Sequence, residues 1–359
     1  MYLVSSQKTG ELFAMKQLNK SDMIKYNKVK RVFTEREILL TVQHPFIVSL
    51  NYCWHEMDSI YFIMEYCPCG DLYTLIRRQK KLPEKHVQFY SAEILLALEY
   101  LHCFGYMYRD LKPENVLLHE SGHIKLTDFD LCKISELPNN NTVIREMFGD
   151  IKKVSMVPNL MSNSLVGTAH YIAPEMIENK RYTAAVDWWT FGVLIYELLI
   201  GVTPFKGDTR EDIFKMISLS SRDKIKFPTK EISKNAKNII RALLNPKPKK
   251  RLGSKNGAPD VKEHPFFENI DWPLIRDSTP PFIPPFIPPF IPTVHSSLQT
   301  PPTLQKDKDE TPQSLSSHIP SLTQSKLQKQ TQTQTQTINK DYDIFSEFKS
   351  VSKERIKCN

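Results

Sequence analysis

Residues 108–115 read Tyr-Arg-Asp-Leu-Lys-Pro-Glu-Asn, and a second acidic stretch, Asp-Phe-Asp, follows at 128–130. Moving a phosphoryl group to a hydroxyl requires a carboxylate that orients the hydroxyl and takes its proton, and a cation that offsets charge on the phosphoryl group. An amide oxygen and a second carboxylate must also hold Mg²⁺. These four groups occur here in the order Asp110, Lys112, Asn115 and Asp128. The stretch therefore predicts a catalytic site for phosphoryl transfer.

Composition excludes several other classes of protein. The 359 residues are 40% hydrophobic and 25% charged, as in ordinary globular proteins. The net charge of +8 is modest and favours solvated lysines over a nucleic-acid partner. The six cysteines form no disulfide or zinc pattern, which favours a reducing, cytoplasmic location. The longest apolar run, Trp188 to Val202, contains Glu197 and is too short to span a bilayer.

The order of predicted elements indicates an α+β fold with two lobes. Strand-like runs at 1–18, 46–52 and 60–66 surround a predicted helix at 21–42. The later part is mostly helical, with helices predicted at 84–104, 187–200, 209–219 and 233–244. We therefore expect a small strand-rich lobe over 1–66 and a larger helical lobe over 67–272.

A C-terminal extension is predicted from residue 273 to residue 359. Residues 280–292 repeat Pro-Pro-Phe-Ile three times, which favours a polyproline II conformation. Residues 293–340 contain neither aromatic residues nor glycine, and we expect them to be disordered because they have little apolar surface to bury. Aromatic residues return within 341–352, which indicates a second ordered segment.

The string at 108–115 together with Asp128 resembles the protein-kinase signature, with tyrosine in place of its first histidine, as in many AGC-group kinases. An acidic solvated loop is the alternative interpretation, but the eight-residue string together with Asp128, in a two-lobed pattern, weighs against it. The resemblance implies the two-lobed kinase fold with ATP and Mg²⁺ as cofactors. Asp110 then orients the substrate hydroxyl and accepts its proton, and Lys112 stabilises developing charge. Asn115 and Asp128 hold the metal ion.

The same resemblance assigns residues to nucleotide binding. Lys16 matches the lysine that contacts the ATP phosphates, and its partner is Glu35 on the following helix. Glu37 is the rival partner, but the two glutamates lie about 200° apart around a helix, so only one of them can face Lys16. Glu65 and Cys67 match the hinge, whose backbone bonds adenine, and Asp71 follows at the ribose.

Substrate handling is implied by further motifs. Lys112 and Thr168 are typical of serine/threonine kinases, and Thr168 is expected to hydrogen-bond Asp110 and Lys112. Carboxylates that would select arginine upstream of the target residue stand at Asp71, Glu114 and Glu197.

Structural roles follow for three other residues. Glu175 of the Ala-Pro-Glu motif is expected to pair with Arg251, and Asp187 to brace the catalytic loop and cap a helix.

Two regulatory features are implied. The long activation segment, 128–175, carries Ser164 where AGC kinases receive an activating phosphate from an upstream kinase. Its phosphate would bind among three cations, Arg31, Arg109 and Lys133. Phe345 and Phe348 resemble the hydrophobic motif that docks on the small lobe. The alternatives are that Ser164 is one of several nearby serines and that the two phenylalanines belong to a stray amphipathic end.

Asp130, in place of the usual glycine, resembles the branch of fungal flippase kinases and plant phototropins. By that analogy the protein substrates include lipid-flippase subunits, with recruitment to membranes as a peripheral protein. We expect a monomer.

The glycine-rich loop of kinases, Gly-x-Gly-x-x-Gly-x-Val, is expected just before Met1 and is not in this sequence. The favoured interpretation is an N-terminally truncated gene model or an alternative start. A kinase with weak ATP binding and a non-catalytic binding scaffold are the alternatives. The retained Lys16, Glu35, Asp110, Asn115 and Asp128 argue against the scaffold, which needs none of them.

Overall fold

The computed structural model describes residues 1–134, 164–220, 225–228, 231–282, 345, 348 and 351–352. The chain divides into two compact units. One comprises Met1–Ile287 with Ser350–Asn359, and the other comprises Pro288–Lys349. The predicted disordered segment, 293–340, lies outside the described residues, as does 135–163 of the activation segment.

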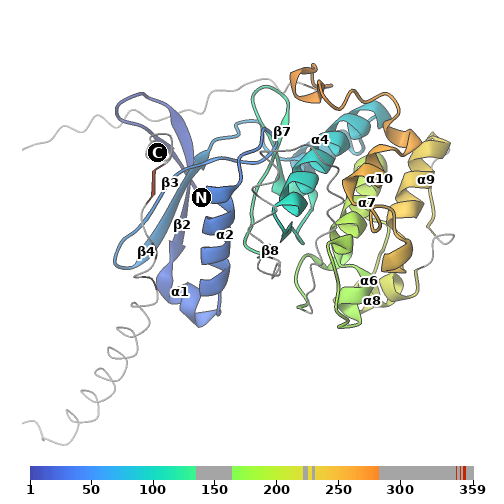
Figure 1. Ribbon diagram of the computed structural model, residues 1–359, viewed down its shortest axis with the longest axis horizontal. Helices are drawn as coiled ribbons and strands as arrows, with labels where there is room; N and C mark the ends of the chain where they lie inside the picture. The colour runs from blue at the N-terminus through green and yellow to red at the C-terminus, as the bar shows by residue number, and fades with distance from the viewer. Residues whose placement is uncertain are drawn as a thin grey trace, which may run out of the picture. The chain divides into compact units, whose positions relative to one another are not determined.

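The strand-rich part is an antiparallel sheet with the order β1-β2-β4-β3-β9 (Figure 1). The first four strands are β1 (Tyr2–Ser5), β2 (Leu12–Asn19), β3 (Leu50–His55) and β4 (Ser59–Glu65). The outermost strand, β9 (Val351–Ser352), comes from the far end of the chain and pairs with Tyr52 and Cys53 of β3. A strand was predicted at 46–52, but its first residues form only an isolated bridge, Ile47 to Leu126.

The helix predicted at 21–42 is in fact two helices, α1 (Lys20–Lys25) and α2 (Val29–Thr41). They separate at Asn27, whose φ of 51° lies in the left-handed region that asparagine tolerates better than most residues. Ser21 and Asp22, which open the predicted range, lie inside α1. The true N-cap is Asn19, whose side chain accepts a hydrogen bond from Ser21 N.

The helical part is built around α7 (Ala185–Ile200), in which nearly every residue is buried. Gly192 allows α9 (Lys234–Leu243) to approach closely, because a Cβ at Gly192 would lie 2.8 Å from Leu243 Cβ. The other helices of this part, among the described residues, are α3 (Leu72–Gln79), α4 (Glu84–Cys103), α6 (Pro174–Ile177), α8 (Arg210–Ser218) and α10 (Ala258–Lys262). Four of these seven, α4, α7, α8 and α9, correspond to predicted helices.

Short strands and turns connect these helices. The strands form two antiparallel pairs, β5 (Tyr106–Met107) with β8 (Lys133–Ile134), and β6 (Val116–Leu118) with β7 (Ile124–Leu126). In the part of the chain that the structure describes, 3₁₀ turns lie at Pro113–Asn115, Ala169–Tyr171, Pro248–Lys250, Pro265–Phe267 and Ile275–Asp277. No helix in the described ranges combines the length and apolar character needed to cross a membrane. The mixed α+β fold with a sheet lobe and a helical lobe is confirmed.

A buried ion pair ties the activation segment to the helical part. Arg251 donates from Nη1 to Glu175 Oε1 at 2.7 Å and from Nη2 to Glu175 Oε2 at 2.9 Å. Arg251 Nη1 also donates to the carbonyl of Ala185 at 2.7 Å. Both side chains are almost fully buried, so removing one partner leaves the other charge without compensation.

We expect Arg251→Ala to destabilise the protein by about 3–5 kcal/mol, because the Glu175 carboxylate then stays buried and unpaired. Thermal unfolding measures the effect. The double variant Arg251→Met with Glu175→Leu replaces both charges by apolar groups and should regain much of the loss. A single variant that melts like the native protein would contradict a buried, charge-compensating pair.

Candidate active site

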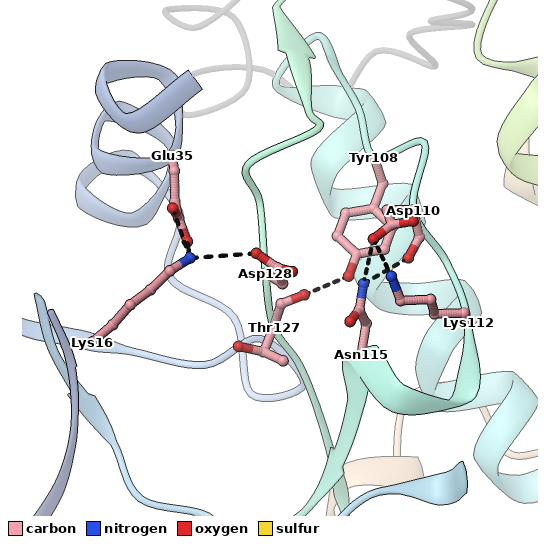
Figure 2. Close-up of polar contacts among 8 residues, drawn as sticks. All are labelled: Lys16, Glu35, Tyr108, Asp110, Lys112, Asn115, Thr127 and Asp128. Atoms are coloured by element: carbon pink, nitrogen blue, oxygen red, sulfur yellow. Dashed lines mark hydrogen bonds and ion pairs between the residues drawn. The ribbon is translucent and has the colours of Figure 1, made fainter. Parts of the chain in front are cut away.

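The catalytic-loop residues form one hydrogen-bonded group (Figure 2). Lys112 Nζ lies 2.6 Å from Asp110 Oδ2, and Asn115 Nδ2 donates to the same oxygen at 2.9 Å and to the Asp110 carbonyl at 2.8 Å. Within the described part of the chain, Asp110 Oδ1 accepts no hydrogen bond. Two donors thus fix one carboxylate oxygen of Asp110, and the other could accept a hydrogen bond from a hydroxyl.

The environment of Asp110 suits it to accept a proton. Burial raises its pKa, hydrogen bonds from Lys112 and Asn115 oppose that rise, and the nearby charge of Asp128 adds to it. The net direction is upward, which makes the carboxylate a stronger base than a solvated aspartate.

The loop conformation is held by Asp187, which lies in the first turn of α7. Its Oδ1 accepts from Arg109 N at 2.8 Å, and its Oδ2 accepts from Tyr108 N at 3.0 Å. Arg109 has a φ of 64°, a strained value for a residue with a side chain. The predicted bracing role of Asp187 therefore has a structural basis. The predicted capping role does not, because the helix begins two residues earlier and its N-cap is Ala184.

Lys16, Glu35 and Asp128 meet between the sheet and the catalytic loop (Figure 2). Lys16 Nζ lies 2.7 Å and 2.9 Å from the two oxygens of Glu35, and 3.4 Å from Asp128 Oδ1. Glu35 is buried in α2, whereas Glu37 is exposed, so the helix presents the predicted partner to Lys16.

Lys16 is protonated and Glu35 is ionised in their ion pair. Burial acts to lower the pKa of Lys16, but Glu35 and Asp128 outweigh it and the net pKa is raised. Burial raises the pKa of Glu35, and Lys16 opposes that rise. With the ammonium within 3 Å of both carboxylate oxygens, we assign the charged form to both partners.

Asn115 and Asp128 fit the requirements of a Mg²⁺ site. The amide nitrogen of Asn115 is used by Asp110, which leaves its oxygen as a hard ligand, and Asp128 keeps a partly exposed carboxylate. Thr127, the residue before Asp128, donates its backbone N–H to the Asn115 carbonyl at 3.0 Å. In the described ranges no group of three or more His, Cys, Asp or Glu side chains could hold a metal alone. Two oxygen ligands from the protein are enough for Mg²⁺, which completes its shell with phosphates and water.

The predicted adenine-binding residues lie at the end of β4 and just beyond it. Glu65 N donates to the Ser49 carbonyl at 2.9 Å, so only the carbonyl of Glu65 could serve a nucleotide. The backbone N–H of Cys67 has no partner among the described residues. Burial raises the pKa of the Cys67 thiol to about 12, which keeps it neutral. Asp71, predicted at the ribose, caps α3 by accepting from Thr74 N at 2.7 Å.

Around Ser164 the structure adds a residue that sequence reasoning missed. Arg109 Nη1 donates to Ser164 Oγ at 2.8 Å and to Tyr182 OH at 2.9 Å, and Tyr182 OH donates to the Ser164 carbonyl at 2.7 Å. Tyr182 carries no motif signal apart from lying five residues before Asp187. The hydrogen bonds predicted from Thr168 to Asp110 and Lys112 do not occur in the described part of the chain.

Two of the predicted substrate-binding acids are electrostatically linked. Tyr171 donates its hydroxyl to Glu197 Oε2, and the charge of Glu114 adds to the effect of burial in raising the pKa of Glu197. The third predicted substrate-binding acid, Asp71, accepts a hydrogen bond at the N-terminus of α3.

Phe345 and Phe348 are both fully buried, and Phe348 N donates to the Phe345 carbonyl at 2.9 Å. Their docking on the small lobe stays a prediction.

Comparison with known proteins gives the family. The protein kinase domain matches residues 1–267. Flippase kinase 1 of Saccharomyces cerevisiae is 47% identical over 289 residues, 79% of this chain and 32% of that protein. Serine/threonine-protein kinase nrc-2 of Neurospora crassa is 47% identical over 296 residues, 79% of this chain and 47% of that protein. Phototropin-1A of Oryza sativa subsp. japonica is 46% identical over 294 residues, 78% of this chain and 31% of that protein.

The chain therefore belongs to the protein kinase family. The resemblance to AGC-group kinases of the flippase-kinase and phototropin type is confirmed by these relatives. The chain spans about a third to a half of the length of these three curated relatives.

Proposed function

We propose that this chain transfers the γ-phosphoryl group of ATP to serine or threonine hydroxyls of proteins. The observation that carries the proposal is the arrangement at Asp110, where Lys112 and Asn115 fix one carboxylate oxygen and leave the other open to a hydroxyl. Asp110 orients that hydroxyl and takes its proton. Lys112 offsets the negative charge that develops on the phosphoryl oxygens.

Nucleotide binding is proposed for the neighbouring groups. Lys16, held by Glu35, binds phosphate oxygens, and Asn115 with Asp128 holds Mg²⁺, which neutralises phosphate charge when bound. The Cys67 N–H and the Glu65 carbonyl bind adenine, and Asp71 lies at the ribose. A non-catalytic scaffold is the competing proposal, and it predicts none of the kinetic effects below.

Asp110→Asn should lower phosphorylation of a serine peptide by about 100-fold or more, because the amide cannot accept the proton. Affinity for Mg²⁺-ATP, measured by calorimetry, should stay within a few fold of the native value. Glu120→Gln, which changes an exposed carboxylate on the nearby β6–β7 turn, serves as the matched control. Full turnover by the Asp110 variant would remove it from the mechanism, and a native chain that neither binds ATP nor turns over would favour the scaffold.

We also propose that substrates carry arginine upstream of the target residue. Glu114 is exposed and Glu197 is half-buried, and the charge of one acts on the other. Two carboxylates this close attract a guanidinium, which can bind carboxylate oxygens in pairs.

Glu197→Gln should reduce the preference for an arginine peptide over the alanine-substituted peptide by about tenfold, the equivalent of one charge-assisted hydrogen bond. The rate on the alanine peptide should stay unchanged, which separates lost recognition from damaged chemistry. Equal loss on both peptides would mean that Glu197 supports the fold and does not read the substrate.

Ser164 is proposed as the phosphorylation switch, the phosphate being added by an upstream kinase. Its hydroxyl already lies 2.8 Å from Arg109 Nη1, next to the catalytic Asp110. A phosphate would add about two negative charges beside that guanidinium and fix the loop in place. Arg31 and Lys133 are the other proposed partners, and the predicted docking of Phe345 and Phe348 is retained as a second regulatory proposal.

Ser164→Ala should prevent activation by an upstream kinase while leaving the thermal stability nearly unchanged. Mass-spectrometric mapping of the active protein should find phosphate on Ser164. An active native protein with Ser164 unmodified would overturn the switch.

Lipid-flippase subunits are the proposed physiological substrates, since one relative at 47% identity is named a flippase kinase. On this proposal the reaction takes place at the membrane surface, with the chain recruited as a peripheral protein. Peptides from the cytosolic segments of such flippases, with arginine upstream of serine or threonine, are the natural substrates for the tests above.

A further inference from the structure

Asp130 stands where most kinases have glycine, and none of the roles assigned above uses it. The backbone here does not require glycine, because within 128–130 only Asp128 has a positive φ, 61°. Phe129, between the two acids, is fully buried and packs edge to face on Tyr108, with 5.6 Å between ring centroids. Asp130 therefore fits without strain, and its half-buried carboxylate favours a nearby cation.

Two hydrogen bonds fix the backbone next to Asp130. Arg109 Nε donates to the carbonyl of Leu131 at 2.8 Å, and Cys132 N donates to the carbonyl of Phe129 at 3.1 Å. The first of these bonds comes from the catalytic loop. Asp130 is therefore held in a defined position relative to that loop.

Helix α2 presents Arg31 on the same face as Glu35, because the two residues are four positions apart. That face lies toward Lys16, which Glu35 contacts, and Lys16 in turn contacts Asp128 (Figure 2). Arg31 is half-buried, and its guanidinium makes no hydrogen bond or ion pair with any described residue. The helix therefore brings a second cation to the side on which residues 128–130 lie.

Charges from both sides of the site act on Asp130. Burial and the charges of Asp128 and Asp110 raise the pKa of Asp130, and the cations Lys16 and Arg31 oppose that rise. Lys16 is already held by other carboxylates at hydrogen-bonding distance, so Arg31 is the cation that remains for Asp130. The two are not hydrogen-bonded to each other in the structure, and their attraction acts over a longer distance.

We propose that Asp130 is a positioning residue, whose carboxylate attracts Arg31 and so holds α2, with Glu35 in contact with Lys16, without needing a phosphate on Ser164. The inference deepens the proposed function and rests on it for the kinetic part of the test. Arg31 is also a proposed partner of the Ser164 phosphate. Asp130 supplies that cation with an acidic partner before any phosphate is added.

Backbone amide exchange of α2 tests the attraction in the unphosphorylated chain, prepared with a phosphatase. Asp130→Asn and Arg31→Gln each remove one charge and should speed exchange of the α2 amides about threefold, as expected for a partly exposed charge pair. The double variant should exchange no faster than either single variant, because both remove the same attraction. Arg31→Lys keeps the charge and should exchange close to the native rate. Lys30→Gln, which removes an exposed cation from the same helix, is the matched control and should leave exchange unchanged.

Kinetics provide a second readout, which a general loss of stability would not produce. In the two single variants the KM for ATP should rise about threefold while kcat stays within about twofold, because the position of Lys16 depends on α2 and the Asp110 group is untouched. The proposal is wrong if the two effects on exchange multiply to about ninefold in the double variant, or if Asp130→Asn exchanges at the native rate. A native chain that transfers no phosphate would count against the proposed function, and the exchange measurement would still decide the role of Asp130.

Discussion

Asp187 is fully buried, and three donors converge on its carboxylate: His102 Nε2 and the backbone N–H groups of Tyr108 and Arg109. These bonds hold Arg109 in a left-handed conformation that its side chain disfavours. The strained residue lies directly before Asp110, so the carboxylate on α7 determines where the proposed proton acceptor points. Loss of this anchor would release the loop even with every catalytic side chain still present.

The same helix also fixes the proposed substrate end of the site. Asp187 and Glu197 are ten residues apart in α7, so about 15 Å separates them along the axis. Helix α7 is buried on nearly all sides, and α9 packs closely against it at Gly192. Because the core is tightly packed, any tilt of α7 would disturb the whole helical part. One rigid helix therefore fixes the positions of both the catalytic loop and the acidic group around Glu197.

Sequence reasoning located the groups that the structure brings together where residue type and family pattern agreed. Residue type and order indicated that Asp110, Lys112 and Asn115 belong together, and the family pattern indicated Glu35 as the partner of Lys16. It failed at Asn27, where a single left-handed residue divides a periodic helix that amphipathic patterning treats as continuous. Tyr182 could not have been found, since its importance comes from tertiary contacts that no local pattern encodes.

The outer position of β9 has a consequence for the order in which the sheet is completed. Its residues pair with Tyr52 and Cys53 across about 300 positions of intervening chain. At ribosomal speeds of about 5–20 residues per second, this separation leaves the free side of β3 uncovered for roughly 15–60 seconds after that strand is made. An open strand edge invites pairing with other chains. The nascent protein therefore has a window in which self-association competes with its own completion, and truncation before Val351 would make that window permanent.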